Sequence, residues 1–277
     1  MSKSIKKQVD EAQNHRSPEL DLSDKNISKI LDIPSLFSLA DHLTRLTLSH
    51  NKIDSVPPAV VELHKLEVLN LFNNHIEELP TNFSSMQNLK RLNVGMNRLY
   101  HLPRGFGAFP KLEVLDLTYN NLSENSLSKN FFLLGTLRAL YLSDNDFEVI
   151  PEEIGKLTQL KQLAIRDNDL ISLPQAIGEL AMLRELHIQG NRLTVLPPEL
   201  GKLDLYSNQA VFRADNNPWV PPILDQFQVG VSHVFEYIRS DTYKYLYGRH
   251  MQAGAAPPPK KANKSKKICK KEIWGKK

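Results

Sequence analysis

The chain has 277 residues, of which 41% are hydrophobic, and this is enough apolar material for one sizeable core. Its net charge is +4 and its single cysteine, Cys269, excludes an internal disulfide framework and a cysteine-rich zinc site, so we expect a reducing intracellular setting. The apolar runs are too short to cross a bilayer, and residues 1–15 carry neither the apolar core of a secretory signal nor a myristoylation glycine.

Residues 1–18 are polar and predict an N-terminal cap that is helical in part. From residue 19 the sequence repeats, beginning with a degenerate copy at Leu20, Leu22 and Ile27. The regular copies follow the pattern LxxLxLxxNxLxxLPxxIxxLxx with a period of 23 residues. The copy from Leu112 to Thr136 is the exception, because it has 25 residues and lacks the central proline.

Each slot of the repeat has a physical reason. The fourth and sixth positions, such as Leu69 and Leu71, alternate along a short strand and point into the interior. At the ninth position an asparagine amide can satisfy the backbone groups that the chain leaves unpaired where it exits the strand. The Leu-Pro pair that follows ends the inward loop and opens a short helical turn on the convex side. This spacing does not fit an amphipathic helical array and predicts, over residues 19–220, an α/β leucine-rich-repeat solenoid with a parallel sheet on its concave face.

The C-terminal part of the chain predicts a cap and a tail. Residues 215–219 close the repeats, and residues 221–252 predict a helical cap. Its apolar stripe covers the last repeat rather than forming a partner groove, and consists of Ile223, Phe227, Val231, Val234, Phe235, Ile238, Tyr245 and Leu246. Residues 253–277 contain nine Lys and one Glu after a proline run, and we expect a disordered, solvated tail. Binding of anionic lipid, binding of nucleic acid and nuclear import are the alternatives for this tail.

Function is expected on the concave face, where the third, fifth, seventh and eighth positions of the repeat point outwards. Large apolar and aromatic residues occupy some of these positions, with charged residues around them, as at the centres of protein interfaces. Stacking between neighbouring strands would account for any one of them, but the group as a whole favours a binding patch. The predicted partner-binding residues are Phe72, Arg91, Asn93, Met96, Asp116, Tyr119, Tyr141, Asp144, Arg166, Asp167 and His187.

Catalysis is not expected. The histidines are scattered, Asp116 and Asp144 lie on an open sheet without a pocket, and no phosphate loop, nucleotide fingerprint or metal-ligand spacing is present. We therefore predict no catalytic residues, no cofactor and no metal.

Several longer strings are more specific than the repeat. They include LEVLDLTYNNLSENSL at 112–127, LRALYLSDNDFE at 137–148, FRADNNPWV at 212–220 and HVFEYIRSDTYKYLYGRHMQA at 233–253. Through them nearly the whole chain resembles the Ras suppressor family of intracellular leucine-rich-repeat adaptors, and the likeness is weakest in the first twenty residues and after Ala253.

The resemblance implies a monomeric, cytoplasmic adaptor at cell-matrix (focal) adhesions that modulates Ras signalling. Its concave repeats would bind the last LIM domain of the protein PINCH, and through PINCH the chain would join integrin-linked kinase and parvin. No nucleic-acid partner is expected, and membrane contact through the tail is kept only as an alternative. The alternative is a regulatory solenoid that seats a phosphatase or a small-GTPase pathway protein on the same face.

Overall fold

The computed structural model describes residues 3–254 and 256–260, which form two compact units. The first unit ends at Leu137 and the second begins at Arg138. Most of the predicted tail, with Cys269 and Trp274, lies outside the described residues.

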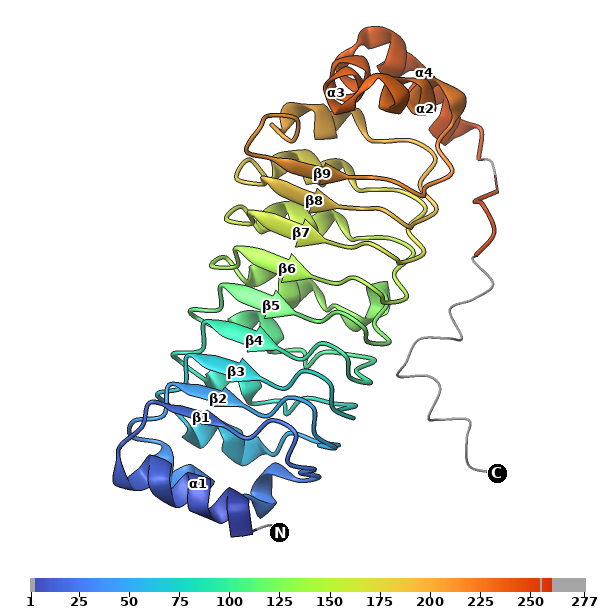
Figure 1. Cartoon of the computed structure of the whole chain (residues 1–277). Helices are drawn as coiled ribbons and strands as arrows, with labels where there is room; N and C mark the ends of the chain where they lie inside the picture. Colours follow the sequence, from blue (N-terminus) through green and yellow to red (C-terminus); the bar gives the residue numbers. More distant parts are fainter. Residues whose placement is uncertain (1–2, 255, 261–277) are drawn as a thin grey trace, which may run out of the picture. The chain divides into compact units, whose positions relative to one another are not determined.

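In the first unit a helix precedes a series of parallel strands (Figure 1). Adjacent strands pair in register, so that the central leucines Leu46, Leu69 and Leu92 align. The elements are α1 (Lys3–Asn14), β1 (Glu19–Asp21), β2 (Arg45–Thr47), β3 (Val68–Asn70), β4 (Arg91–Asn93) and β5 (Val114–Asp116). Helix α1 lies beside β1 and buries Ile5, Val9 and Ala12, which share one face of the helix.

The second unit repeats this arrangement and ends in three helices. Its strands are also parallel and in register, with Leu140, Leu163 and Leu186 aligned. The elements are β6 (Ala139–Tyr141), β7 (Gln162–Ala164), β8 (Glu185–His187), β9 (Val211–Arg213), α2 (Pro221–Val229), α3 (Val231–Arg239) and α4 (Asp241–Gln252).

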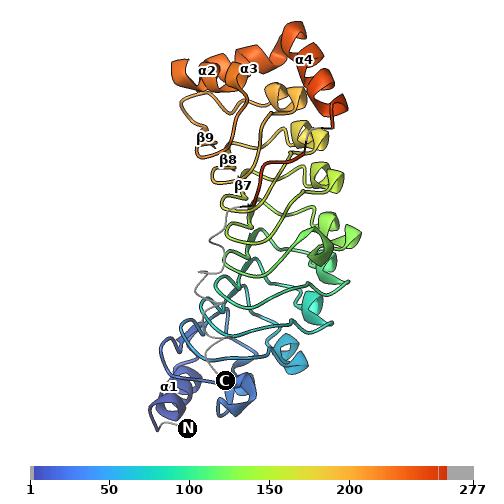
Figure 2. The same cartoon turned by 90° about the vertical axis from the view of Figure 1, so that its right-hand side faces the viewer.

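Short 3-10 helices return the chain on the side away from the strands (Figure 2). In the first unit they are η1 (Ile30–Asp32), η2 (Leu36–Leu39), η3 (Pro58–Glu62), η4 (Phe83–Ser85), η5 (Phe106–Ala108), η6 (Glu124–Ser126) and η7 (Lys129–Leu133). In the second they are η8 (Glu152–Lys156), η9 (Gln175–Glu179) and η10 (Pro198–Lys202). Four of them, η3, η8, η9 and η10, begin directly after the Leu-Pro slot of their repeat, where an extended proline is the N-cap.

The longer repeat without a proline contains two of these helices. Ser123 and Ser126 form a reciprocal capping box around η6, which replaces the missing proline as the start signal. The Ser126 hydroxyl also donates to the Tyr100 carbonyl at 2.7 Å, and Phe131 of η7 is fully buried. The extra residues therefore form a packed turn of the convex side.

The ninth-position asparagines make a ladder of buried hydrogen bonds. The Asn97 amide nitrogen donates to the carbonyls of Leu71, Val94 and Gly95 at 3.0–3.1 Å, and its oxygen accepts from the Ile76 amide at 3.0 Å. Each side chain thus joins two consecutive repeats. The same pattern recurs at Asn51, Asn74, Asn120, Asn168 and Asn191.

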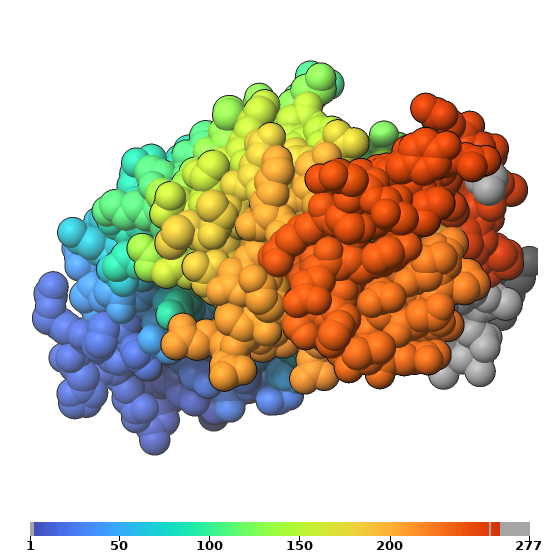
Figure 3. Space-filling model, turned by 90° about the horizontal axis from the view of Figure 1, so that it is seen from above, coloured from blue at the N-terminus to red at the C-terminus, as the bar shows by residue number. Residues whose placement is uncertain are grey.

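The C-terminal helices cover the open end of the second unit (Figures 1 and 3). The Phe212 ring of β9 packs edge-on against Phe235 of α3 at 5.3 Å and stacks on Phe227 of α2 at 6.3 Å. These aromatic contacts shield the core of the last repeat from water.

The predicted apolar stripe is wrong in α4. Tyr245 is 66% exposed and Leu246 is 40% exposed, whereas Tyr243 and Tyr247 are buried. Ser240 is the reason, because its hydroxyl caps a new helix by accepting from the Tyr243 amide at 3.1 Å, so the helical register does not continue from α3. Burial raises the pKa of Tyr243, whose hydroxyl donates to the Leu196 carbonyl at 2.6 Å.

The predicted fold class, a leucine-rich-repeat solenoid with parallel strands and C-terminal helices, is confirmed. Within the described part of the chain, no helix combines the length and the apolar character that a membrane span requires.

The ladder predicts that replacing a ninth-position asparagine lowers the free energy of unfolding far more than replacing a surface asparagine of the same unit. Asn97→Ala removes the partner of several buried backbone groups and should lower the free energy of unfolding by about 3 kcal/mol or more. Asn88→Ala is the matched control, since its amide makes a surface hydrogen bond to the His64 carbonyl, and it should cost about 0.5 kcal/mol. Denaturant titrations of both variants measure the difference; equal losses would show that the ladder does not stabilise the repeats.

Candidate partner-binding surface

The predicted site residues lie on the face formed by the strands and the turns directly after them, which we call the sheet face. None of them is buried, and most are half-exposed. The first unit carries Phe72, Arg91, Asn93, Met96, Asp116 and Tyr119, and the second carries Tyr141, Asp144, Arg166, Asp167 and His187.

The eighth position of the repeat has a left-handed backbone throughout the chain. Asparagine, aspartate and glycine tolerate this conformation best, and they occupy most of these positions. Met96 (φ 55°) and Tyr119 (φ 52°) adopt it without that advantage. Two large side chains are therefore held half-exposed on the sheet face at a backbone cost, which points to a role outside folding.

A pair of aromatic rings lies on the sheet face of the first unit, near its N-terminal end. The Phe72 ring meets the His50 ring edge-on at 5.6 Å, and the His50 Nδ1 lies 2.8 Å from the Asn73 amide nitrogen. His50 is exposed and Phe72 half-buried, so one edge of the pair is open to a partner.

Asn93 and Asp116 each hold the turn after their own strand. The Asn93 side-chain oxygen accepts from the Gly95 amide at 2.9 Å, and Asp116 Oδ1 accepts from the amide and hydroxyl of Thr118 at 2.9 and 2.6 Å. A Cβ at Gly95 would lie 2.9 Å from the Thr118 hydroxyl, so a side chain there would disturb the group. The structure thus gives these two predicted contact residues a local structural role as well.

A hydrogen-bonded chain crosses three strands of the second unit. The Tyr141 hydroxyl donates to Gln162 at 2.8 Å, and the Gln162 amide donates to Glu185 at 2.6 Å. The other oxygen of Glu185 lies 2.9 Å from His187 Nε2. Tyr141 and His187 are therefore connected through two residues that the sequence analysis did not select. Gln162 and Glu185 occupy third positions of the repeat, which point outwards, and this position was the signal in the sequence by which they could have been selected.

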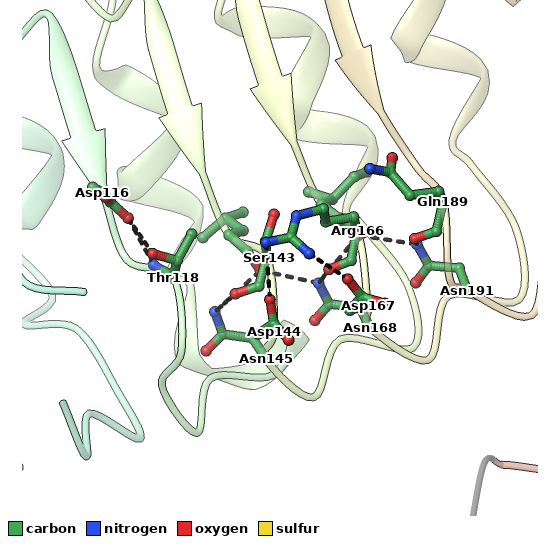
Figure 4. Close-up of polar contacts among 12 residues, drawn as sticks. Asp116, Thr118, Ser143, Asp144, Asn145, Arg166, Asp167, Asn168, Gln189 and Asn191 are labelled. Carbon is green, nitrogen blue, oxygen red and sulfur yellow. Dashed lines mark hydrogen bonds and ion pairs between the residues drawn. The ribbon is translucent and has the colours of Figure 1, made fainter. Parts of the chain in front are cut away.

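Arg166 lies between two carboxylates in the same unit (Figure 4). Its Nη1 is 2.6 Å from Asp167 and its Nη2 is 3.5 Å from Asp144. Gly190 packs closely against this group, because a Cβ there would come within 2.3 Å of Asp167 Oδ1. The cluster is acidic by one charge, and its cation is already engaged within the chain.

In residues 3–254 and 256–260, no group of three His, Cys, Asp or Glu side chains is placed to hold a metal ion. One cavity of about 590 Å³ lies away from the sheet face and is lined by Glu199, Lys202, Arg239 and Lys244 among others. The sheet face is suited to contact with a macromolecular surface rather than to enclosure of a small substrate.

Comparison with known proteins identifies the repeats and the relatives of the chain. The model of the family "Leucine-rich repeat region" matches residues 101–218, "Leucine Rich repeats (2 copies)" matches residues 41–85, and "Leucine rich repeat" matches residues 79–122. Ras suppressor protein 1 from Homo sapiens is 72% identical over 276 residues, which is 100% of this chain and 99% of the relative. The Bos taurus and Mus musculus proteins of the same name are 71% and 68% identical over the same shares.

Solved structures agree on the fold. A Leptospira interrogans leucine-rich-repeat protein superposes with a TM-score of 0.56 at 27% identity, over 76% of this chain and 64% of the other. The ectodomain of an Arabidopsis thaliana membrane receptor kinase, solved in complex with Casparian strip integrity factor 2, gives a TM-score of 0.54 at 30% identity, over 67% of this chain and 22% of the other.

The left-handed eighth position predicts a trade-off that a pair of reciprocal exchanges can measure. Met96→Asn should raise the free energy of unfolding by about 0.5–1 kcal/mol, because asparagine tolerates the left-handed backbone better. The reverse exchange in the preceding repeat, Asn73→Met, should lower it by a similar amount, since Asn73 has φ 56°. Thermal denaturation of both variants tests this, and destabilisation by Met96→Asn would show that packing rather than binding accounts for the methionine.

Proposed function

The chain belongs to the Ras suppressor protein 1 family of leucine-rich-repeat proteins, and on this premise we propose that it is a non-enzymatic adaptor in Ras-related signalling. The adaptor binds another protein through the sheet face. The near-complete coverage of relatives at 68–72% identity supports transfer of the role that their name states.

The proposed partner is a LIM-domain protein, PINCH, which would bring the chain to integrin-linked kinase and parvin at focal adhesions in the cytoplasm. A LIM domain is a small zinc module with an exposed and often basic surface. The acidic groups of the sheet face, Asp116 in one unit and the Asp144–Arg166–Asp167 cluster in the other, have the charge that complements such a surface.

The observation that carries the proposal is the pair of residues Met96 and Tyr119. A solenoid that needed only stability would place asparagine, aspartate or glycine in a left-handed turn. Methionine and tyrosine are among the residues enriched where proteins bind each other, because they supply contact area and adaptable packing.

Arg166 gives the surface a means of discrimination. In the free chain its guanidinium neutralises part of the charge of Asp144 and Asp167. A partner cation must therefore offer these carboxylates better geometry than Arg166 does, or share them with it. A partner that buries the cluster without supplying a polar group binds less tightly, because nothing offsets the free-energy cost of removing these charges from water.

Titration calorimetry of the full chain with the C-terminal LIM domain of PINCH tests the proposal. Tyr141→Ala removes a half-exposed aromatic side chain and should weaken binding by about 2 kcal/mol, which is roughly thirtyfold. Asp116→Asn keeps the oxygen that accepts from Thr118 but removes the charge, so it should weaken binding while leaving the melting temperature unchanged.

Tyr245→Ala is the matched control, because Tyr245 belongs to the same unit as Tyr141 but lies on α4 and is 66% exposed. It should leave the affinity unchanged. If the wild-type chain does not bind the LIM domain, the proposed partner is wrong. If it binds and Tyr141→Ala and Asp116→Asn bind equally well, the partner stands and the contact surface lies elsewhere.

A further inference from the structure

Within the second unit, side chains at the same position of the repeat are exposed in one copy and buried in another. Val149 and Val195 both occupy the thirteenth position, yet Val149 is 37% exposed and Val195 is 6% exposed. The tenth position behaves alike: Asp146 is half-buried, whereas Arg192 is 5% exposed. Since the repeat itself places these side chains at the surface, something outside the repeat covers the last copies.

Two segments cover these copies. The end of α4 lies beside Val195, because Thr194 and Leu196 bond to His250 and Tyr243, and the start of the C-terminal tail is bound by Arg192. The Arg192 Nε donates to the carbonyl of Pro258 at 2.6 Å. Pro258 is half-buried, while its neighbours Pro257 and Pro259 are exposed. A hydrogen bond from a guanidinium to a backbone carbonyl is charge-assisted, and here it is shielded from water on the arginine side.

An ion pair holds the next residue of the segment. The Lys260 ammonium lies 2.5 Å from Glu148 Oε1, and the other oxygen of Glu148 lies 3.6 Å from Arg192 Nη1. Glu148 therefore links the lysine of the tail to the arginine that binds the proline. The hydrogen bond to Glu148 raises the pKa of Lys260, as expected for an ammonium with an anionic acceptor.

The end of α4 delivers the segment to this place. His250 Nε2 lies 3.1 Å from the Thr194 hydroxyl, which fixes the last turn of α4 beside the same repeats. Gly254 follows in a left-handed conformation (φ 57°), which reverses the chain after the helix. Figure 2 shows the dark red segment beyond α4 running over the turns of the last repeats.

The packing under the segment is incomplete. A cavity of about 260 Å³ lies between Pro257 and Val195, and another of about 550 Å³ is bounded by Pro258, Arg192 and Asp167. The segment is thus attached at the two points described above and bridges the spaces between them. Three consecutive prolines lose little conformational entropy on binding, so a few contacts are enough to hold them.

We propose that this edge of the second unit, formed by Glu148, Arg192 and Val195, is a docking site for a proline run followed by lysine, and that the chain's own residues 256–260 are its tethered and releasable occupant. The eight further lysines after Lys260 are opposite in charge to the carboxylates Asp146 and Asp169 of the same edge. Because the docked segment bounds the cavity beside Asp167, its release changes the surface offered at that end of the sheet face.

The Arg192 Nε–H group reports directly on docking. We would label the full chain with 15N-arginine, assign this resonance by its loss in Arg192→Lys, and measure its hydrogen exchange. Replacing Pro257, Pro258 and Pro259 with glycine keeps the length but removes the preorganised run, and exchange should accelerate about tenfold or more as the site opens. Lys260→Met and high salt should each accelerate it, since both partners of the ion pair are partly exposed.

Lys156→Met is the control, because it removes the same charge from an exposed position of η8 in the same unit. Its exchange rate should equal that of the wild type. Unchanged exchange in both tail variants overturns the proposal, and Lys260→Met remains decisive if the triple-glycine chain folds poorly. Protection that increases with protein concentration would show that the occupant comes from a second copy, which overturns the tethered arrangement.

Discussion

The amide ladder of the ninth position is the constraint on which the remaining structure depends. A strand of three residues can satisfy few backbone groups, and the chain must turn inside the protein directly after it. Asn97 and its equivalents donate to carbonyls of their own repeat and of the previous one and accept from a backbone amide of the previous one, so each repeat is completed by its neighbour. No repeat is stable alone, and the two ends need caps, which α1 and α2–α4 provide in their respective units.

The ladder also determines where function can lie. Because asparagine and leucine occupy the buried side of each turn, the fold does not require particular side chains on the outward side of the strands and turns. Several outward side chains nevertheless stabilise the fold as well as being open to a partner: Asp116 holds its own turn, and Tyr141 belongs to a hydrogen-bonded chain across three strands. Such a surface is preorganised, so a partner meets side chains whose conformations are already restricted, and less entropy is lost on binding.

The fold could be predicted well because the same pattern occurs in many copies, so an irregular copy can be interpreted by comparison with the regular ones. The same redundancy located the outward columns, so that the predicted site residues lie unburied on the sheet face. It could not reveal the pairing of Arg166 with Asp144 and Asp167, or the involvement of Gln162, since side-chain partners depend on rotamers and not on slots. Outside the repeats no second copy was available for comparison. The predicted apolar stripe of the C-terminal helices is wrong beyond Ser240, because this residue caps a new helix with its own register.

The tail shows why composition alone is a weak guide to what a segment contacts. Lysine and proline cannot build a core, and on this composition we expected residues 253–277 to be a disordered tail, whereas residues 256–260 contact the second unit. Docking needs no core of their own, however, because a preorganised proline run needs only a hydrogen-bond donor for its carbonyl and a counter-charge for its lysine, and Arg192 and Glu148 provide these. Each is an ordinary polar residue in a surface slot of the repeat. The signal is the burial of Arg192, which is only 5% exposed in a slot that the repeat places at the surface. A comparison of equivalent positions along a repeat protein can therefore locate a docking site that neither motif nor composition identifies.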